Sequence, residues 1–171
     1  MSSLAHYGPR EAADGSDAVK EVRAYLAARA VAACAAGVPR WAVVLDPGLG
    51  FAKQAAHSFA LLRPAGRLDE RGAAGGGELG LAGFPLLYGP SRKRFLGGVL
   101  RPREVGGGGD LTPDLPLPSQ RVWATAAAVT AAIALGAEFV RVHDVPPMRD
   151  VVDVADAIYR NAGVAPPSPT I

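Results

Sequence analysis

The stretch Val43–Lys53 reads VVLDPGLGFAK, and it decides the fold because an apolar run ends abruptly in a carboxylate and a glycine-rich turn. The run Trp41–Leu45 is typical of a strand that is buried on both faces. Pro47 has no amide donor, so we expect the strand to stop there. The two glycines that follow permit unusual backbone angles and let a ligand approach closely. Parallel α/β proteins build their sites at such strand ends, although a plain turn in which Asp46 caps the next helix fits the local pattern equally well.

Two later stretches have the same form. Phe84–Gly97 reads FPLLYGPSRKRFLG, an apolar strand followed by a Gly-Pro break, a hydroxyl and three basic residues. Phe139–Pro147 reads FVRVHDVPP, a short strand whose end carries Arg141 and His143. Because the carboxyl ends of adjoining parallel strands meet at one rim, we expect Asp46, the basic cluster and the Arg/His pair to face a shared hollow.

These segments together resemble the dihydropteroate synthase family of pterin-binding TIM-barrel enzymes. The matching segments are DPGLGFAK with the following His57, then SRKRFLG, then RVHDV, in that family's order and spacing. The resemblance runs from about Tyr7 to Tyr159 but covers only the C-terminal part of the family's length. Ala52 and the segment SRKRFLG are similar to the actinobacterial form of the family. It implies an α/β fold, a partial (β/α)₈ TIM barrel made of the last three βα units and one preceding helix.

The remaining elements follow from periodicity and capping signals. The sequence predicts a flexible N-terminus over 1–16, the barrel portion over 17–161 and a disordered tail over 162–171, with a glycine-rich connection at 68–83 and a mobile loop at 101–118. Asp17 and Ser119 are expected to cap the first and third helices. One face of the last helix is expected to consist of Val151, Val154, Ala155 and Ile158. The expected helices are 18–36, 54–63, 121–135 and 148–161, and the expected strands are 41–45, 84–88 and 138–142.

The length of the chain is short for a complete barrel. A (β/α)₈ barrel takes about 250 residues, whereas this chain has 171. The resemblance equates the three strands with the sixth to eighth, so we expect a C-terminal fragment of a synthase or a gene whose start is placed too late. The DNA upstream of Met1 would separate these readings. Three strands leave open edges, so we expect the isolated chain to be marginally stable or prone to aggregation.

Charge and composition exclude several function classes. The net charge is +2 and the basic residues cluster only at Arg92–Arg94, which argues against a nucleic-acid partner. The single Cys34 cannot form an internal disulfide and fits a reducing cytoplasm. The longest apolar run, Val122–Leu135, is too short for a bilayer, and the N-terminus lacks the apolar core of a signal peptide. We therefore expect a cytoplasmic protein without a membrane partner.

The resemblance also implies a reaction. It joins p-aminobenzoate to 6-hydroxymethyl-7,8-dihydropterin pyrophosphate and releases 7,8-dihydropteroate and pyrophosphate, the work of a transferase in folate biosynthesis. The implied catalytic residues are Lys93, Arg141 and His143. The implied pterin contacts are Asp46, Gly50, Phe51, Gly89, Lys93 and Arg141; the implied pyrophosphate contacts are Arg141 and His143; and Arg94 lies where the family lines the p-aminobenzoate side.

The chemistry of these side chains fits those roles. A carboxylate such as Asp46 can accept two hydrogen bonds from the N–H edge of a pterin. Lys93 can donate to the ring carbonyl, and the flat guanidinium of Arg141 can stack on the ring and also reach phosphate. His143 can donate to a phosphate oxygen as the leaving group departs. Mg²⁺ is implied by the family, with its protein ligand expected in the missing N-terminal part and no metal ligand in this chain, and a homodimer through the C-terminal helices is expected.

Each residue also has a purely structural interpretation. Lys93 fits a solvated basic surface, Arg141 can pair with Asp144, and His143 can be a structural histidine, as we expect His57 to be. Ala52, Ser58 and Pro90 depart from the residues usual in the family. A non-catalytic pterin- or pyrophosphate-binding remnant that associates with an intact homologue therefore stays open. A nucleotide-binding domain does not fit, because GLGFAK lacks the Gly-Lys-hydroxyl ending of a P-loop.

Overall fold

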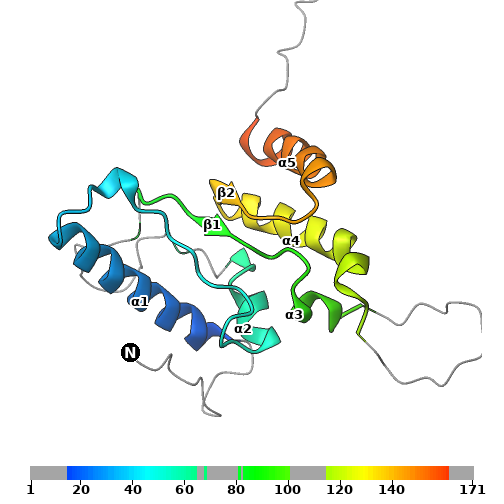
Figure 1. The fold of residues 1–171 in the computed structure, drawn as a ribbon, viewed down its shortest axis with the longest axis horizontal. Helices are drawn as coiled ribbons and strands as arrows, with labels where there is room; N and C mark the ends of the chain where they lie inside the picture. The colour runs from blue at the N-terminus through cyan, green and yellow to red at the C-terminus, as the bar shows by residue number, and fades with distance from the viewer. Residues whose placement is uncertain (1–14, 65–67, 69–80, 82, 101–114, 162–171) are drawn as a thin grey trace, which may run out of the picture.

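The computed structural model describes residues 15–64, 68, 81, 83–100 and 115–161 (Figure 1). The predicted disorder of the N-terminus and of the tail therefore concerns segments that lie almost wholly outside the described residues. Most of the glycine-rich connection and of the loop at 101–118 also lies outside them. The described elements are α1 (Ser16–Ala35), a 3₁₀ turn η1 (Arg40–Ala42), α2 (Ala55–Ala60), β1 (Leu87–Tyr88), α3 (Arg94–Gly97), a 3₁₀ turn η3 (Pro118–Arg121), α4 (Val122–Ala134), β2 (Phe139–Val140) and α5 (Val145–Arg160).

Parallel pairing at the centre of the molecule confirms the predicted α/β class. β1 and β2 are parallel, with Leu87 opposite Phe139 and Tyr88 opposite Val140. On the other side of β1, Leu45 forms an isolated parallel bridge to Leu86. Figure 1 shows β1 between α1 and α2 on one side and α4 and α5 on the other. The ends of these three segments are therefore neighbours, as a parallel arrangement requires.

The predicted strand over 41–45 is wrong for most of its length. Residues Arg40–Ala42 form a 3₁₀ turn, and the indole of Trp41 is 83% exposed rather than buried. Among the described residues only Leu45 of this run pairs with a neighbouring segment: its amide donates to Pro85 (2.9 Å), and its carbonyl accepts from Leu87 (2.8 Å). The apolar composition predicted burial, but the chain finds ladder partners only where residues 85–87 run beside it.

The other two strands are shorter than predicted. Only two residues of the run 84–88 form a strand. Pro85 has no amide to donate, and the Phe84 amide donates to the Leu81 carbonyl at 3.1 Å within a turn. The run 138–142 also keeps only two strand residues. The side chain of Glu138 accepts the Leu86 amide at 2.7 Å, so a carboxylate replaces the ladder bond that the backbone would make there.

The helices lie close to their predicted ranges, but their caps differ. α1 follows Gly15, which has a left-handed φ of 78°, and Asp17 lies in the first turn paired with Lys20 (3.1 Å) instead of capping the helix. Ser119 does not cap α4, because the 3₁₀ turn η3 occupies 118–121 and the N-cap position is Arg121. The structural role expected of His57 is confirmed, and it is a capping role: its Nδ1 accepts the Gln54 amide at 3.1 Å at the start of α2.

The face that α5 buries agrees with the predicted one at Val151 and Ala155 but not at Val154 and Ile158. Met148 and Ala155 are buried against α4, whereas Val154 and Ile158 are 60% and 63% exposed. Two prolines in its first turn let α5 begin at Val145, three residues before the predicted start, because the amides there need no intrahelical partner.

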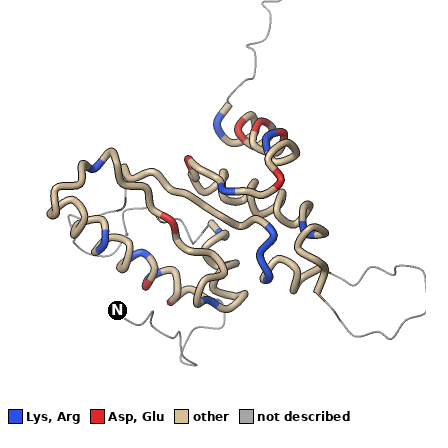
Figure 2. The backbone as a smooth tube through the Cα atoms, in the orientation of Figure 1, with Lys and Arg blue, Asp and Glu red and all other residues tan. Residues whose placement is uncertain are grey.

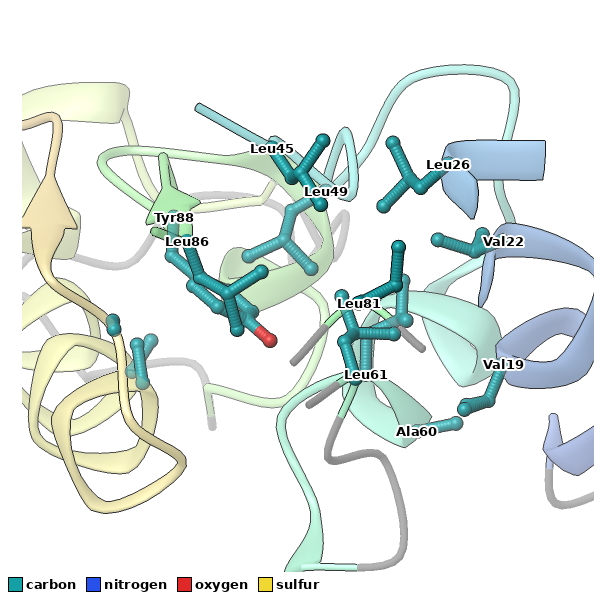
Figure 3. Close-up of a cluster of buried hydrophobic side chains, with 14 of the residues drawn as sticks. Val19, Val22, Leu26, Leu45, Leu49, Ala60, Leu61, Leu81, Leu86 and Tyr88 are labelled. Atoms are coloured by element: carbon teal, nitrogen blue, oxygen red, sulfur yellow. The ribbon is translucent and has the colours of Figure 1, made fainter. Parts of the chain in front are cut away.

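The main core lies between α1, α2 and β1 (Figure 3). Leu61 and Tyr88 are fully buried in it, and Leu45 and Leu49 bring the Asp-Pro-Gly turn into the same cluster. α4 and α5 enclose a second, smaller cluster around Val129 and Met148. The two clusters flank β1 and β2, so the ends of the parallel segments are supported from both sides.

Candidate functional site

The segments that follow β1 and β2 surround a pocket of about 410 Å³. Of the predicted site residues, Gly89, Lys93, Arg141 and His143 line it. The remaining lining residues are Ser91, Arg92 and Pro118. Figure 2 shows the run of basic residues that leads from β1 into α3. Two residues of this run, Arg92 and Lys93, line the pocket. The site is strongly cationic, which is the chemistry that a polyanion requires.

Asp46 stands at the start of a tight turn next to this pocket. One of its carboxylate oxygens accepts the amide of Gly48 at 2.7 Å, and Gly48 itself has a left-handed φ of 68°. This bond fixes the direction of an otherwise exposed carboxylate. Asp46 does not line the pocket, but its charge acts on Lys53 and on Lys93.

Lys93 connects the Asp46 turn to the pocket. Its ammonium lies 3.6 Å from the centre of the Phe51 ring, a cation–π contact. Burial lowers the pKa of Lys93, and the neighbouring Arg141 lowers it further, while Asp46 opposes both effects. A side chain at Gly50 would place a Cβ 3.3 Å from Lys93 Cδ. A small residue at position 50 therefore leaves room for the lysine stem.

Gly89 gives Arg141 its place at the pocket. A Cβ at Gly89 would lie 2.8 Å from an Nη atom of Arg141, which is closer than Cβ atoms pack. The Arg141 amide donates to Tyr88 at 2.9 Å, so the last ladder bond after β2 holds this arginine beside β1. The guanidinium remains exposed and can meet a ligand.

Two side-chain pairs that sequence reasoning missed join the segments after β1 and β2. Ser91 Oγ accepts the His143 amide at 3.1 Å and lies 2.9 Å from His143 Nδ1. Arg92 Nε donates to Asp144 at 3.0 Å, and a second Arg92 nitrogen binds the other carboxylate oxygen. This hydrogen bonding by Arg92 holds the pKa of Asp144 below its ordinary value, and burial opposes the effect only in part.

These pairs also correct one structural alternative, because Asp144 pairs with Arg92 and not with Arg141. Both pairs join residues 52 positions apart, the same offset as Tyr88 and Val140 in the sheet. The register of the parallel strands thus continues past their ends into the site. The order Ser-Arg in one segment and His-Asp in the other is the sequence signal that could have revealed them.

The backbone of Arg92 is held from α4 and η3. Its amide donates to Thr125 Oγ1 at 3.0 Å, and its carbonyl accepts from Arg121 at 2.9 Å. Arg121 is itself buried and also donates to Pro116 at 2.8 Å. Arg92 has a left-handed φ of 58°, a conformation that needs such support in a residue with a Cβ. Lys93 therefore follows a rigidly held residue.

Besides Asp46, three predicted residues lie outside the pocket lining. Arg94 is exposed at the start of α3, while Gly50 and Phe51 reach the pocket only through Lys93. No group of three or more His, Cys, Asp or Glu side chains within the described ranges could hold a metal ion. None of the described helices is long and apolar enough to cross a membrane.

The sequence pattern of the family described as "Pterin binding enzyme" matches residues 4–143. The chain belongs to this family. It is 40% identical over 160 residues to the dihydropteroate synthase of Synechocystis sp., a match that covers 94% of this chain and 44% of that protein. The chain thus spans about half the length of this relative.

Solved structures agree with this membership of the pterin-binding enzymes. The dihydropteroate synthase of Thermus thermophilus in complex with 6HMPPP matches with a TM-score of 0.62 at 40% identity, over 84% of this chain and 47% of that one. The same enzyme in complex with 4-aminobenzoate matches with a TM-score of 0.60 at 41% identity, over 84% and 48%. The fold described above is therefore shared with synthase structures.

Proposed function

We propose that this chain carries the pterin and pyrophosphate side of a dihydropteroate synthase site. The observation that carries the proposal is the pocket of about 410 Å³ around Lys93, Arg141 and His143, with Asp46 close enough to act on Lys93. Family membership makes this reaction class the first choice, and relatives bind 6HMPPP and 4-aminobenzoate by their descriptions. The substrate class is therefore a pterin pyrophosphate together with an aromatic amine.

In the proposed reaction, a carbon–oxygen bond breaks and a carbon–nitrogen bond forms. The bridging oxygen of 6-hydroxymethyl-7,8-dihydropterin pyrophosphate leaves with the electron pair as part of pyrophosphate. The amine of 4-aminobenzoate gives its lone pair to the exocyclic carbon and then loses one proton to solvent. The products are 7,8-dihydropteroate and pyrophosphate. Negative charge builds up on the departing diphosphate, so preorganised cations at that position lower the barrier.

Each side chain has a role in this scheme. The Asp46 carboxylate, oriented by the Gly48 amide, accepts N–H groups of the pterin. Lys93 donates to the ring, and its lowered pKa reflects a partly dehydrated ammonium, which binds a carbonyl or phosphate more strongly than a hydrated one. Arg141 stacks on the pterin and reaches phosphate, and His143 donates to a phosphate oxygen as it departs.

The other expected residues complete the proposal. Gly50 and Gly89 leave room for the lysine and arginine side chains, and Phe51 packs beside the ammonium. Arg94 belongs to the 4-aminobenzoate side, next to Lys93 in the chain. The partial barrel, a cytoplasmic location and a homodimer through α4 and α5 stay predictions. Magnesium also stays a prediction, and no step here depends on it.

A second candidate is a non-catalytic binder of pterin or pyrophosphate that associates with an intact homologue. It is favoured by the large apolar side chains that the described part of the chain leaves exposed on α4 and α5: Trp123, Val154 and Ile158. The proposed contacts with the pterin and the diphosphate are the same in both candidates. They differ in turnover and in association with an intact homologue.

Calorimetric titration with the pterin pyrophosphate tests the proposal. We expect Lys93→Gln to weaken binding about tenfold or more, because one charge-assisted hydrogen bond is lost. Lys20→Gln is the matched control, since it removes an exposed lysine on α1. A wild-type chain that does not bind the pterin pyrophosphate would refute both candidates. A dihydropteroate assay with both substrates then separates them, since binding without turnover favours the second.

A further inference from the structure

The environment of Ser91 constrains the imidazole of His143. Ser91 lines the pocket but is only 4% exposed, so its hydroxyl meets little water and depends on protein partners. Its oxygen accepts the His143 amide at 3.1 Å and lies 2.9 Å from Nδ1 of the same residue. Among the described residues, Ser91 Oγ has no hydrogen-bond partner besides these two atoms of His143.

The donor and acceptor count then decides the tautomer. A serine hydroxyl has one proton and two lone pairs. The amide of His143 takes one lone pair as acceptor, and the hydroxyl proton needs a partner of its own. If Nδ1 carried a proton, the serine would accept twice and its own buried proton would be left unpaired, which is costly. If Nδ1 is unprotonated, all three groups are satisfied.

The geometry points to Ser91 as a positioning residue that holds neutral His143 in the tautomer protonated on Nε2. With Nδ1 turned toward the buried serine, Nε2 is the nitrogen left for the pocket that the ring lines. The imidazole then offers a donor to the pocket and not a lone pair. The tautomer does not depend on the proposed function. Only the acceptor that we assign to the Nε2–H donor, a diphosphate oxygen, rests on it.

The tautomer can be measured without any ligand. Two-bond ¹H–¹⁵N spectra of the 171-residue chain, recorded at about pH 8.5 where imidazoles are mostly neutral, distinguish the protonated from the bare ring nitrogen. His57 is an internal reference, because its Nδ1 accepts the Gln54 amide and must be unprotonated. His143→Gln assigns the signal. We expect His143 to match the pattern of His57, and a protonated Nδ1 would overturn the inference.

Substitutions then test whether Ser91 is the cause. Ser91→Ala is expected to move His143 toward a mixture of tautomers, and Ser91→Thr, which keeps the hydroxyl, to restore the Nε2–H form. Ser58→Ala is the control, because it removes another buried hydroxyl, one that serves the Gly50 amide at 3.1 Å. The His57 signal reports whether each variant is folded. An unchanged tautomer in folded Ser91→Ala would overturn the role of Ser91.

Inorganic pyrophosphate is the probe for the consequence. We expect Ser91→Ala to bind it about tenfold more weakly than the wild type, since the donor is present only part of the time. Wild-type affinity in a Ser91→Ala variant with mixed tautomers would overturn the claim that the fixed donor serves this ligand. A wild-type chain that keeps the Nε2–H tautomer yet binds no pyrophosphate would refute the proposed function and leave the assignment of Ser91 intact.

Discussion

Gly89 sets the position of Arg141 by leaving no room for a side chain. A Cβ there would lie 2.8 Å from an Nη atom, and the ladder bond to Tyr88 prevents the arginine backbone from withdrawing. Gly89→Ala must therefore displace the guanidinium. We expect calorimetry to show about tenfold weaker binding of inorganic pyrophosphate.

Gly98→Ala is the control for this effect. Its Cβ would find its nearest heavy atom at 3.6 Å, an ordinary contact, and φ at this position is −66°. The alanine variant at position 98 should bind pyrophosphate like the wild type. Equal affinity in the Gly89→Ala variant would show that Arg141 does not contact the diphosphate.

The ion pair between Arg92 and Asp144 gives a prediction about pH. Hydrogen bonding to Arg92 lowers the pKa of Asp144 below its ordinary value of 3.8. Because the folded pKa is depressed, the contribution of this pair to stability is present above about pH 4 and is lost as the pH falls through the folded pKa. Carboxyl ¹³C titration should give a midpoint below 3.8 in the wild type.

Two arginine substitutions test that assignment. Arg92→Gln should raise the midpoint of Asp144, since the largest cause of its lowered pKa is removed. Arg94→Gln, an exposed neighbour of the same charge, should leave it unchanged. A midpoint that responds equally to both variants would mean that general charge, and not the paired geometry, sets the pKa.

At the scale of elements, α4 holds the segment after β1 through one buried hydroxyl. Thr125 is fully buried and accepts the amide of Arg92, a residue with a left-handed φ. Thr125→Val keeps the shape but leaves that amide without an acceptor, which costs about 1–3 kcal/mol. We expect amide hydrogen exchange at Arg92 to accelerate about tenfold or more.

Thr130→Val is the matched control on the same helix. Thr130 Oγ1 donates to Ala126 at 3.0 Å, a bond within α4 that no other element shares. Its loss should leave exchange at Arg92 unchanged. If Thr130→Val accelerated that exchange as much as Thr125→Val, the effect would come from α4 as a whole and not from the bond to Arg92.

The sequence predicted the order of the elements and the residues of the pocket better than the strands themselves. Lys93, Arg141 and His143 each follow an apolar run that ends close to a Gly or Pro break, and the structure brings all three to one pocket. Strand lengths depend on which backbone lies alongside, and at Trp41 no local feature distinguishes an exposed apolar residue from a buried one. The pairs Ser91–His143 and Arg92–Asp144 depend on the register between distant segments, which composition does not encode.

At the scale of the whole molecule, the described residues leave large apolar side chains uncovered on more than one side. Trp41 is 83% exposed and Trp123 is 73% exposed, and Phe139 of β2 is 49% exposed. Apolar area of this kind on a monomer favours association. We therefore expect the isolated chain to self-associate as its concentration rises, and to bind the dye ANS.

Tryptophan quenching measures which surface is responsible, because Trp41 and Trp123 are the two tryptophans of the chain. In dilute solution acrylamide should quench both, as their exposure requires. As the chain associates, the indole at the contact should become protected, and Trp41→Phe and Trp123→Phe variants assign the signal. Protection of Trp123 places the contact at α4, and protection of Trp41 places it at η1. A monomeric chain with a cooperative thermal transition and no ANS binding would contradict the expected association.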